Sequence, residues 1–238
     1  MPRGRSVPCP TVHPEDPRTV WEDVPAGPMT LRIRRPPSAE DLIDEAEFAD
    51  DERLPYWAEV WPSGRVLCGV LAGMRLDGRS VIELGAGIGT GSMVAAMQGA
   101  RALATDWYPA AVEFGRWNAA NLGLDMQAEV MDWRDPPATV MDRAPFDMVI
   151  GADILYEARN GVALGALIPA LCGPGSEVII ADPRRPDARP FVKAMQRAGW
   201  AHSRDDLPVP GRIDETGPVV HVHRFRPPPG KHNAPVVL

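Results

Sequence analysis

From residue 80 onward the sequence alternates regularly between short apolar runs and longer segments of helical character. Helical segments such as YPAAVEFGRWNAANLG separate the apolar runs. Strands that alternate with helices build a parallel sheet with helices on both faces. We therefore predict an α/β fold with a doubly wound, mostly parallel sheet. The five runs on which this prediction rests are SVIEL, RALATD, MQAEVMDW, FDMVIGAD and SEVIIAD, at 80–84, 101–106, 126–133, 146–153 and 176–182.

Two further strand candidates, WAHSRDD and VVHVHRFR, follow at 200–206 and 219–226 with no helical segment between them. Strands that are joined without a crossover helix can pair antiparallel. These two candidates bring the predicted sheet to seven strands and place an antiparallel strand at its C-terminal end. A shorter alternating run, MTLRIRR at 29–35, predicts one more short strand before the series begins.

The segments that flank this series are rich in proline and lack hydrophobic periodicity. We predict a loose arm over residues 1–28, one folded domain over 29–226 and a proline-rich tail over 227–238. Near the start of the domain, SAEDLIDEAEFADDER predicts an acidic amphipathic helix capped by Ser38. Ser63 is the expected cap of the helix that follows.

Charge and composition argue against several kinds of partner. The net charge is −7, whereas binding nucleic-acid phosphates needs a basic face. No apolar run reaches the length of about 18 residues that a membrane span requires. The three cysteines are far apart, so we expect reduced thiols, and we expect a monomer in the cytoplasm. The pair His221 and His223 lacks a third residue at metal-ligand spacing, so we expect no metal site.

A glycine-rich loop directly follows the first strand of the series. In VIELGAGIGT, Gly85 and Gly87 let the backbone approach a ligand, and the next helix presents free N–H groups. A dinucleotide fingerprint needs a third glycine where this chain has Thr90. Glu83 lies two residues before the first glycine, which favours a different nucleotide-containing ligand.

Polar and aromatic residues end three more strands of the series. Asp106 and Trp107 follow the second strand, Asp132 and Trp133 the third, and residues 152–156 the fourth. Ligands of open parallel sheets bind at the carboxyl ends of the strands. Asp106 is suited to accept hydrogen bonds from two ribose hydroxyls. Asp132 and Trp133 are suited to hold an adenine, although Trp133 is equally suited to close a strand end as a hydrophobic plug.

Aromatic residues are concentrated in PYWAEVWPSG, about twenty residues before the glycine loop. The rings of Tyr56, Trp57 and Trp61 can seal the top of a core, or they can form a rigid wall over a ligand pocket, where an aromatic face attracts a cation by about 0.5–2 kcal/mol. For Trp57 we favour a purely structural place in the core.

The form E-x-G-x-G-x-G resembles the first motif of class I S-adenosylmethionine-dependent methyltransferases. Together with LPYWAEVWPSG, TDW, MDW and ADILYE, it resembles the seven-β-strand protein lysine methyltransferases with a D-x-x-Y motif after the fourth strand. That group includes the electron transfer flavoprotein β-subunit lysine methyltransferase. The resemblance extends over about residues 30–226. It implies a Rossmann-like fold and S-adenosylmethionine as the cofactor.

The resemblance also implies an activity and a set of site residues. The implied reaction transfers methyl groups to a lysine side chain of a protein, with Asp153 and Tyr156 as the catalytic pair at the acceptor. The implied cofactor contacts are Trp61, Glu83, Gly85, Ala86, Gly87, Asp106, Trp107, Asp132, Trp133 and Ala152. Three alternatives stay open, namely a small-molecule N-methyltransferase, a non-catalytic module that binds S-adenosylmethionine, and a nicotinamide-dependent oxidoreductase.

Overall fold

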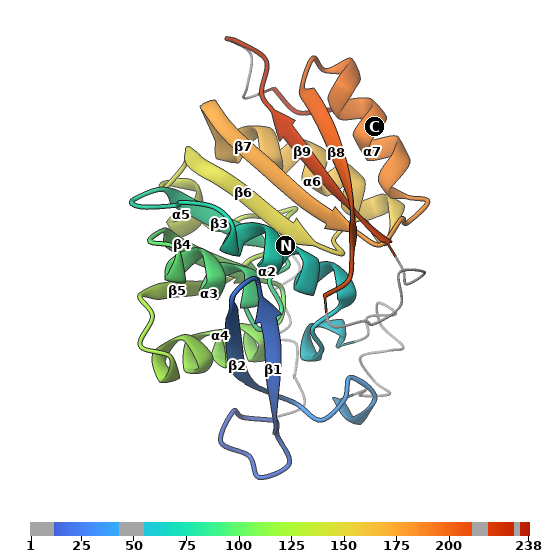
Figure 1. Cartoon of the computed structure of the whole chain (residues 1–238). Coiled ribbons are helices and arrows are strands. Elements are labelled where there is room, and N and C mark those ends of the chain that lie inside the picture. The colour runs from blue at the N-terminus through green and yellow to red at the C-terminus, as the bar shows by residue number, and fades with distance from the viewer. Residues whose placement is uncertain (1–11, 43–54, 211–218, 231–233) are drawn as a thin grey trace, which may run out of the picture.

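The computed structural model describes residues 12–42, 55–210, 219–230 and 234–238. A seven-stranded sheet crosses the molecule in the order β5-β4-β3-β6-β7-β9-β8 (Figure 1). Its strands are β3 (Ser80–Leu84), β4 (Arg101–Asp106), β5 (Met126–Val130), β6 (Phe146–Ala152), β7 (Cys172–Asp182), β8 (Ala201–Pro208) and β9 (Val219–Arg226).

The direction of the strands confirms the predicted sheet. β3 pairs in parallel with both β4 and β6, and the parallel order continues outward to β5 on one side and β7 on the other. β9 is antiparallel to its two neighbours, β7 and β8. The winding therefore reverses at β3, which places the loop after this strand at the switch point where such sheets bind ligands.

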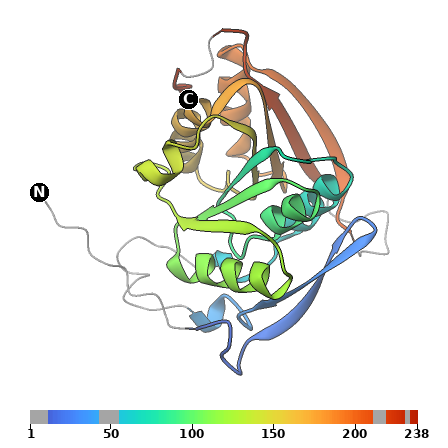
Figure 2. The same ribbon diagram turned by 90° about the vertical axis from the view of Figure 1, so that its left-hand side faces the viewer.

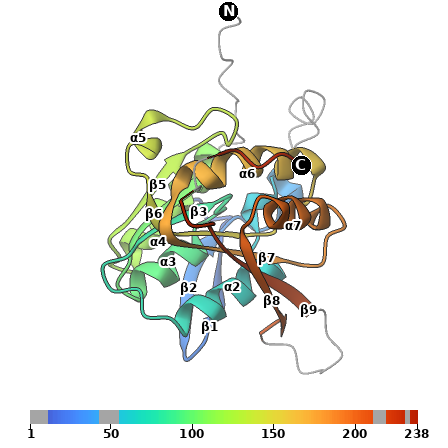
Figure 3. The ribbon, with the colours of Figure 1, turned by 90° about the horizontal axis from the view of Figure 1, so that it is seen from above.

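Helices cover both faces of the sheet (Figure 3). One face carries α2 (Pro62–Ala72), α3 (Thr90–Met97) and α4 (Pro109–Asn121), and the other carries α6 (Ala158–Leu171) and α7 (Ala188–Arg197), with the short α5 (Ala138–Met141) after β5. Each layer has its own apolar core, the first around Leu67 and Phe114 and the second around Leu164 and Phe191. None of the helices in the described ranges is long and apolar enough to cross a membrane.

The prediction of a loose N-terminal arm is wrong for its second half. β1 (Val20–Ala26) and β2 (Met29–Arg35) form an antiparallel hairpin that lies beside α4 (Figure 2). Val24 and Leu31 are fully buried in the core under α2 and α4, so alternate residues of both strands face the domain. The folded domain therefore begins before residue 29. The first eleven residues of the predicted arm lie outside the described ranges.

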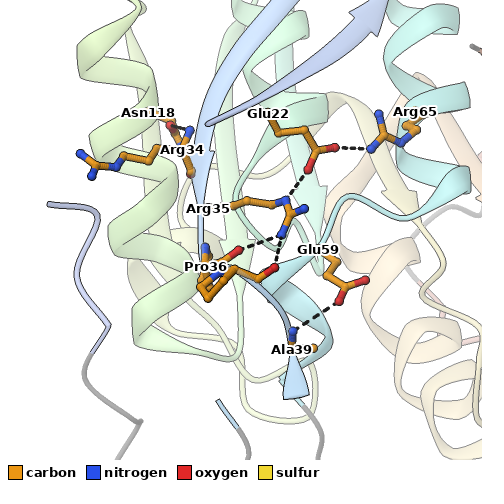
Figure 4. Close-up of polar contacts among 9 residues, drawn as sticks. Glu22, Arg34, Arg35, Pro36, Ala39, Glu59, Arg65 and Asn118 are labelled. Carbon is orange, nitrogen blue, oxygen red and sulfur yellow. Dashed lines mark hydrogen bonds and ion pairs between the residues drawn. The ribbon is translucent and has the colours of Figure 1, made fainter. Parts of the chain in front are cut away.

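Polar contacts fix the hairpin to the domain (Figure 4). The Asn118 side chain in α4 accepts a hydrogen bond from the Arg34 backbone N–H at 2.7 Å and donates one to the Arg34 carbonyl oxygen at 2.9 Å. Glu22 in β1 forms ion pairs with Arg35 in β2 and with Arg65 in α2. The hairpin is thereby linked to the helix that begins at the aromatic segment.

Two expected helix starts differ from the structure. α2 begins at Pro62 with Trp61 as its N-cap, so Ser63 lies inside the first turn and is not the cap. Proline suits the first position of a helix because its missing N–H has no partner there in any case. The acidic helix predicted after Ser38 is described only at its start, where Glu40–Leu42 forms a single 3₁₀ turn, η1, and the remainder lies outside the described residues.

The end of the chain packs onto α6. Val236 is buried and donates its backbone N–H to the Gly165 carbonyl oxygen at 2.8 Å. A Cβ atom on Gly165 would lie only 2.7 Å from the Val236 carbonyl oxygen, and one on Gly161 would lie 2.8 Å from the Leu238 side chain. These two glycines leave a groove in the helix surface that the last residues fill.

Gly165→Ala is therefore expected to lower the free energy of unfolding by about 1–3 kcal/mol, the usual cost of overpacking. Helix propensity alone predicts the opposite sign, a gain of about 1 kcal/mol. Gly69→Ala in α2 is the matched control, because the added methyl group meets nothing within 4 Å. Urea denaturation followed by circular dichroism compares the two variants, and an equal gain in both would contradict the packing of the tail.

Candidate functional site

The loop between β3 and α3 packs its backbone directly against other segments. Gly85 and Gly87 have left-handed φ angles of 62° and 54°, a region that glycine adopts without strain. A Cβ atom on Gly85 would lie 3.0 Å from Ile154 and 3.1 Å from the Trp133 ring. One on Gly87 would lie 3.1 Å from the Trp57 carbonyl oxygen. The loop nevertheless stays partly exposed at 85–87, so its backbone can meet a ligand.

Asp106, at the end of β4, is hydrogen-bonded to the backbone of this loop. Its Oδ2 accepts a hydrogen bond from the Gly87 N–H at 2.8 Å, and its Oδ1 accepts one from the Tyr108 N–H at 2.9 Å. Burial raises the pKa of the Asp106 carboxyl to about 6. Each carboxylate oxygen has two lone pairs, so each can still accept a hydroxyl in addition to its backbone donor.

Glu83 serves the loop in a different way from the one expected. Its side chain points under the loop, where Oε2 accepts hydrogen bonds from the Ser92 N–H and from the Ser92 hydroxyl, both at 2.7 Å. Burial raises the pKa of Glu83 to about 7. The Glu83 side chain thus anchors the first turn of α3 from the buried side of the loop.

The end of β5 carries a compact polar and aromatic cluster. Asp132 accepts hydrogen bonds from the Arg134 backbone N–H and side chain at 2.9 and 3.0 Å. The Arg134 guanidinium in turn lies over the Trp107 ring, 5.5 Å from its centroid. The Trp133 ring lies against Gly85. Asp132 is therefore engaged by its own neighbour, while Trp133 reaches the glycine loop.

The aromatic segment before α2 divides into a buried and an exposed part. Trp57, in the 3₁₀ turn η2 (Tyr56–Ala58), is buried against Phe114 at a centroid distance of 5.6 Å, as expected for a core residue. Trp61 donates its Nε1–H to the Tyr56 carbonyl oxygen at 2.9 Å. The Tyr56 ring packs edge-on against both Trp61 and Tyr156, at 5.7 and 6.0 Å. The half-buried ring of Trp61 and the exposed rings of Tyr56 and Tyr156 thus form a continuous series from the start of α2 to the D-x-x-Y turn.

Asp153, the first residue of the D-x-x-Y turn, has an unusual backbone and a strong partner. Its φ angle is 57°, and its N–H donates to the Ala181 carbonyl oxygen of β7 at 2.8 Å. Arg185 donates a hydrogen bond from Nε to Asp153 Oδ1 at 3.0 Å, and its Nη2 lies 3.0 Å from the same oxygen as part of the ion pair. Asp182, at the end of β7, accepts the Arg185 backbone N–H at 2.7 Å. One polar network therefore joins the carboxyl end of β6 to the carboxyl end of β7.

Sequence reasoning missed Asp182 and Arg185, although a signal was present. SEVIIAD ends in an aspartate in the same way as the strands before it, and Arg185 follows three residues later. The residues that the structure gathers around the carboxyl edge of the sheet are Gly85, Ala86, Gly87, Asp106, Trp107, Trp133 and the turn from Ala152 to Tyr156, with Trp61 beside them. Within the described ranges, no group of three His, Cys, Asp or Glu side chains is arranged to hold a metal ion.

The fold with this site is that of the Rossmann-like methyltransferases. The precorrin-6y C5,15-methyltransferase structure from Geobacter metallireducens GS-15 superposes with a TM-score of 0.54 at 16% identity, over 69% of this chain and 89% of that chain. A model of the lysine methyltransferase family matches residues 47–198, which is more than half of the chain. The protein belongs to this lysine methyltransferase family.

Named relatives share part of their length with this chain. EEF1A lysine methyltransferase 3 of Mus musculus is 33% identical over 138 residues, which are 56% of this chain and 58% of that protein. The electron transfer flavoprotein beta subunit lysine methyltransferase of Rattus norvegicus is 28% identical over 171 residues, 68% of this chain and 63% of that protein. The chain thus spans about three fifths of the length of these relatives.

Glu83→Gln tests the burial of the carboxyl under the loop. Because the pKa of Glu83 is raised from 4.5 to about 7 in the folded state, the native protein holds a proton that the unfolded chain has lost between these pH values. Wild-type stability should therefore fall relative to the variant by about 1.4 kcal/mol per pH unit as the pH rises through this window. Urea denaturation at pH 5, 6 and 7 measures the difference, and parallel stability curves would contradict the burial.

Proposed function

We propose that this protein transfers methyl groups from S-adenosylmethionine to the side-chain nitrogen of a lysine in another protein. The observation that carries the proposal is the position of the D-x-x-Y turn, whose Ile154 side chain packs on Gly85 of the glycine loop. An acceptor that binds at Asp153 and Tyr156 is thereby next to a ligand that binds at the loop. The family match and the names of the relatives support lysine as the acceptor.

The carboxyl edge of the sheet fits the cofactor in three respects. The backbone at Gly85 and Gly87 is partly exposed, and it is held in place by close contacts with Ile154, Trp133 and Trp57 that only glycine allows. Asp106 retains acceptor capacity for the ribose hydroxyls. The exposed ring of Tyr56 and the half-buried ring of Trp61 can attract a cation. When bound, S-adenosylmethionine supplies an electrophilic methyl carbon attached to a sulfonium leaving group.

This protein must hold the neutral amine of the acceptor lysine in line with that methyl carbon. A lysine has a usual pKa of about 10.4, so removing its proton at pH 7 costs about 4–5 kcal/mol. An acceptor that covers the exposed rings of Tyr56 and Tyr156 would exclude water from its lysine, and this desolvation lowers the amine pKa. Burial raises the pKa of the Tyr156 hydroxyl, so this group is protonated at neutral pH and can line the acceptor site. Asp153 accepts a hydrogen bond from the amine and orients it.

We further propose that the protein acts as a monomer in the cytoplasm and binds neither nucleic acid nor membranes. The net charge of −7 supports a protein partner with a basic surface around the target lysine.

The direct test is incubation of the purified protein with methyl-labelled S-adenosylmethionine and three acceptor samples. These are EEF1A, the electron transfer flavoprotein beta subunit, and a cell lysate together with its small-molecule fraction. Label on a protein band, assigned to methyl-lysine by mass spectrometry, supports the proposal. Label in the small-molecule fraction alone favours a small-molecule N-methyltransferase. Binding of S-adenosylhomocysteine without any labelled product favours a non-catalytic module.

Asp106→Ala should weaken binding of S-adenosylhomocysteine by about 1.5–3 kcal/mol, because it removes a charged acceptor from the ribose hydroxyls and from the loop. Isothermal titration calorimetry measures this loss. Asp147→Ala at the start of β6 is a matched control, since this acid accepts hydrogen bonds from Ser80 at the opposite end of the parallel strands. An unchanged affinity in a folded Asp106→Ala variant would refute the ribose role.

Asp153→Asn should keep S-adenosylhomocysteine binding within a few-fold and lose most methyl transfer, because the residue acts on the acceptor. Tyr156→Phe should have a milder effect on transfer, since its ring stays in contact with Tyr56. Both quantities are measured on one preparation whose fold is checked by circular dichroism. If cofactor affinity falls in proportion to activity, Asp153 belongs to the cofactor pocket and the assigned acceptor site is wrong.

A further inference from the structure

The contact between Arg185 and Asp153 is asymmetric. A guanidinium commonly bonds both oxygens of a carboxylate through two parallel hydrogen bonds. Here Nε and Nη2 of Arg185 both approach Oδ1, at 3.0 Å each. Among the described residues Oδ2 of Asp153 has no protein donor, while the Asp153 side chain is only 10% exposed. Oδ2 of this nearly buried carboxylate can therefore accept a hydrogen bond from a donor outside the chain.

Both partners of this contact are held from the end of β7. Asp182 is fully buried and fixes the turn that follows it by accepting the Arg185 N–H. Arg184, inside this turn, has a φ angle of 72°. Asp153 is fixed by the hydrogen bond from its N–H to Ala181. The turn is thus shaped so that the Arg185 side chain returns over the D-x-x-Y segment.

Other charged and titratable groups surround this pair. Asp182 adds a second buried carboxyl, whose Oδ2 has no partner in the described part of the chain. Tyr56 lies on the η2 side, and Tyr156 with the ion pair of Glu157 and Arg159 follows Asp153 along the chain. Within 182–185, Arg184 is exposed, whereas Arg185 is half-buried and makes the ion pair with Asp153.

An uncompensated carboxylate at this place would work against the reaction. A negative charge beside an amine stabilises the ammonium form and raises its pKa, and the ammonium form has no lone pair with which to attack a methyl carbon. A positive charge on the far oxygen of the same carboxylate opposes this effect. The carboxylate can then still accept a hydrogen bond and set the direction of the amine.

We propose that Arg185 is a positioning residue for the methyl acceptor: by occupying Oδ1 and balancing the charge of Asp153, it lets Asp153 orient the acceptor amine through Oδ2 without retaining it as a cation. This inference rests on the proposed function, because it requires the acceptor to bind at the D-x-x-Y turn. It assigns a role to a residue outside that motif, on the loop after β7.

The test uses a probe that needs no knowledge of the acceptor. Sinefungin is an analogue of S-adenosylmethionine in which a carbon with a primary amine replaces the methylated sulfur, so its ammonium group points to where the methyl acceptor binds. S-adenosylhomocysteine lacks this amine. The ratio of the two dissociation constants, measured by calorimetry on the full chain at low salt, reports the electrostatic preference of the acceptor site for a cation.

Arg185→Gln should raise the preference for sinefungin over S-adenosylhomocysteine at least about fivefold, because Asp153 is then uncompensated. Its affinity for S-adenosylhomocysteine should stay within about twofold of wild type, since the residue acts on the acceptor side. Arg185→Lys keeps the charge and should keep the wild-type ratio. Arg184→Gln, which removes the same charge one residue away at an exposed position, is the matched control and should also keep it.

The possible outcomes distinguish the role of Arg185 from the proposed function of the protein. An unchanged ratio in Arg185→Gln overturns the inference and leaves the proposed function intact. An equal loss of affinity for both ligands also overturns it, because it shows that Arg185 merely maintains the fold of the site. If the wild-type protein binds neither ligand, the proposed function itself is wrong, and the inference fails with it.

Discussion

The architecture of the site depends on how closely the backbone of the glycine loop can approach its neighbours. Trp133, Ile154 and the Trp57 carbonyl come from three different segments, and each occupies the space where a side chain on the loop would lie. The conformation of the loop is therefore set by these neighbouring segments as much as by its own turns. Because those segments also carry Tyr56, Trp61 and the D-x-x-Y turn, the close packing at the loop fixes the position of these residues relative to the glycine loop.

Two buried carboxyls support this loop from opposite sides. Glu83 anchors the first turn of α3 through Ser92, and Asp106 holds the Gly87 N–H. Burial raises the pKa of both groups because the loss of hydration outweighs the hydrogen bonds that the protein donates to their charged forms. A ligand that donates hydrogen bonds to Asp106 supplies compensation that the protein alone lacks, so the same burial that costs stability favours binding.

Local pattern explains which parts were predictable. The five parallel strands are apolar runs bounded by turns, and their carboxyl-end residues follow from position alone. The hairpin strand β1 was missed because VWEDVPA is half exposed and contains a proline, and because it is held by its pairing with β2 and by the ion pair of Glu22 with Arg65, 43 residues away. The Asp153–Arg185 contact likewise joins residues 32 apart through the end of β7. Such contacts arise only when the sheet assembles: the aspartate that ends SEVIIAD indicates a residue at the sheet edge, but no local pattern indicates that Arg185 pairs with Asp153.

The attachment of the hairpin through Asn118 has a consequence for tolerance to change. On the hairpin side this attachment uses only the backbone N–H and carbonyl of residue 34, groups that every residue except proline possesses. On the α4 side it uses a side-chain amide, which alone offers a donor and an acceptor at the required spacing. The two positions therefore differ in their tolerance to substitution. Most residues at position 34 would keep these two hydrogen bonds, whereas replacing the side-chain amide at position 118 would remove them.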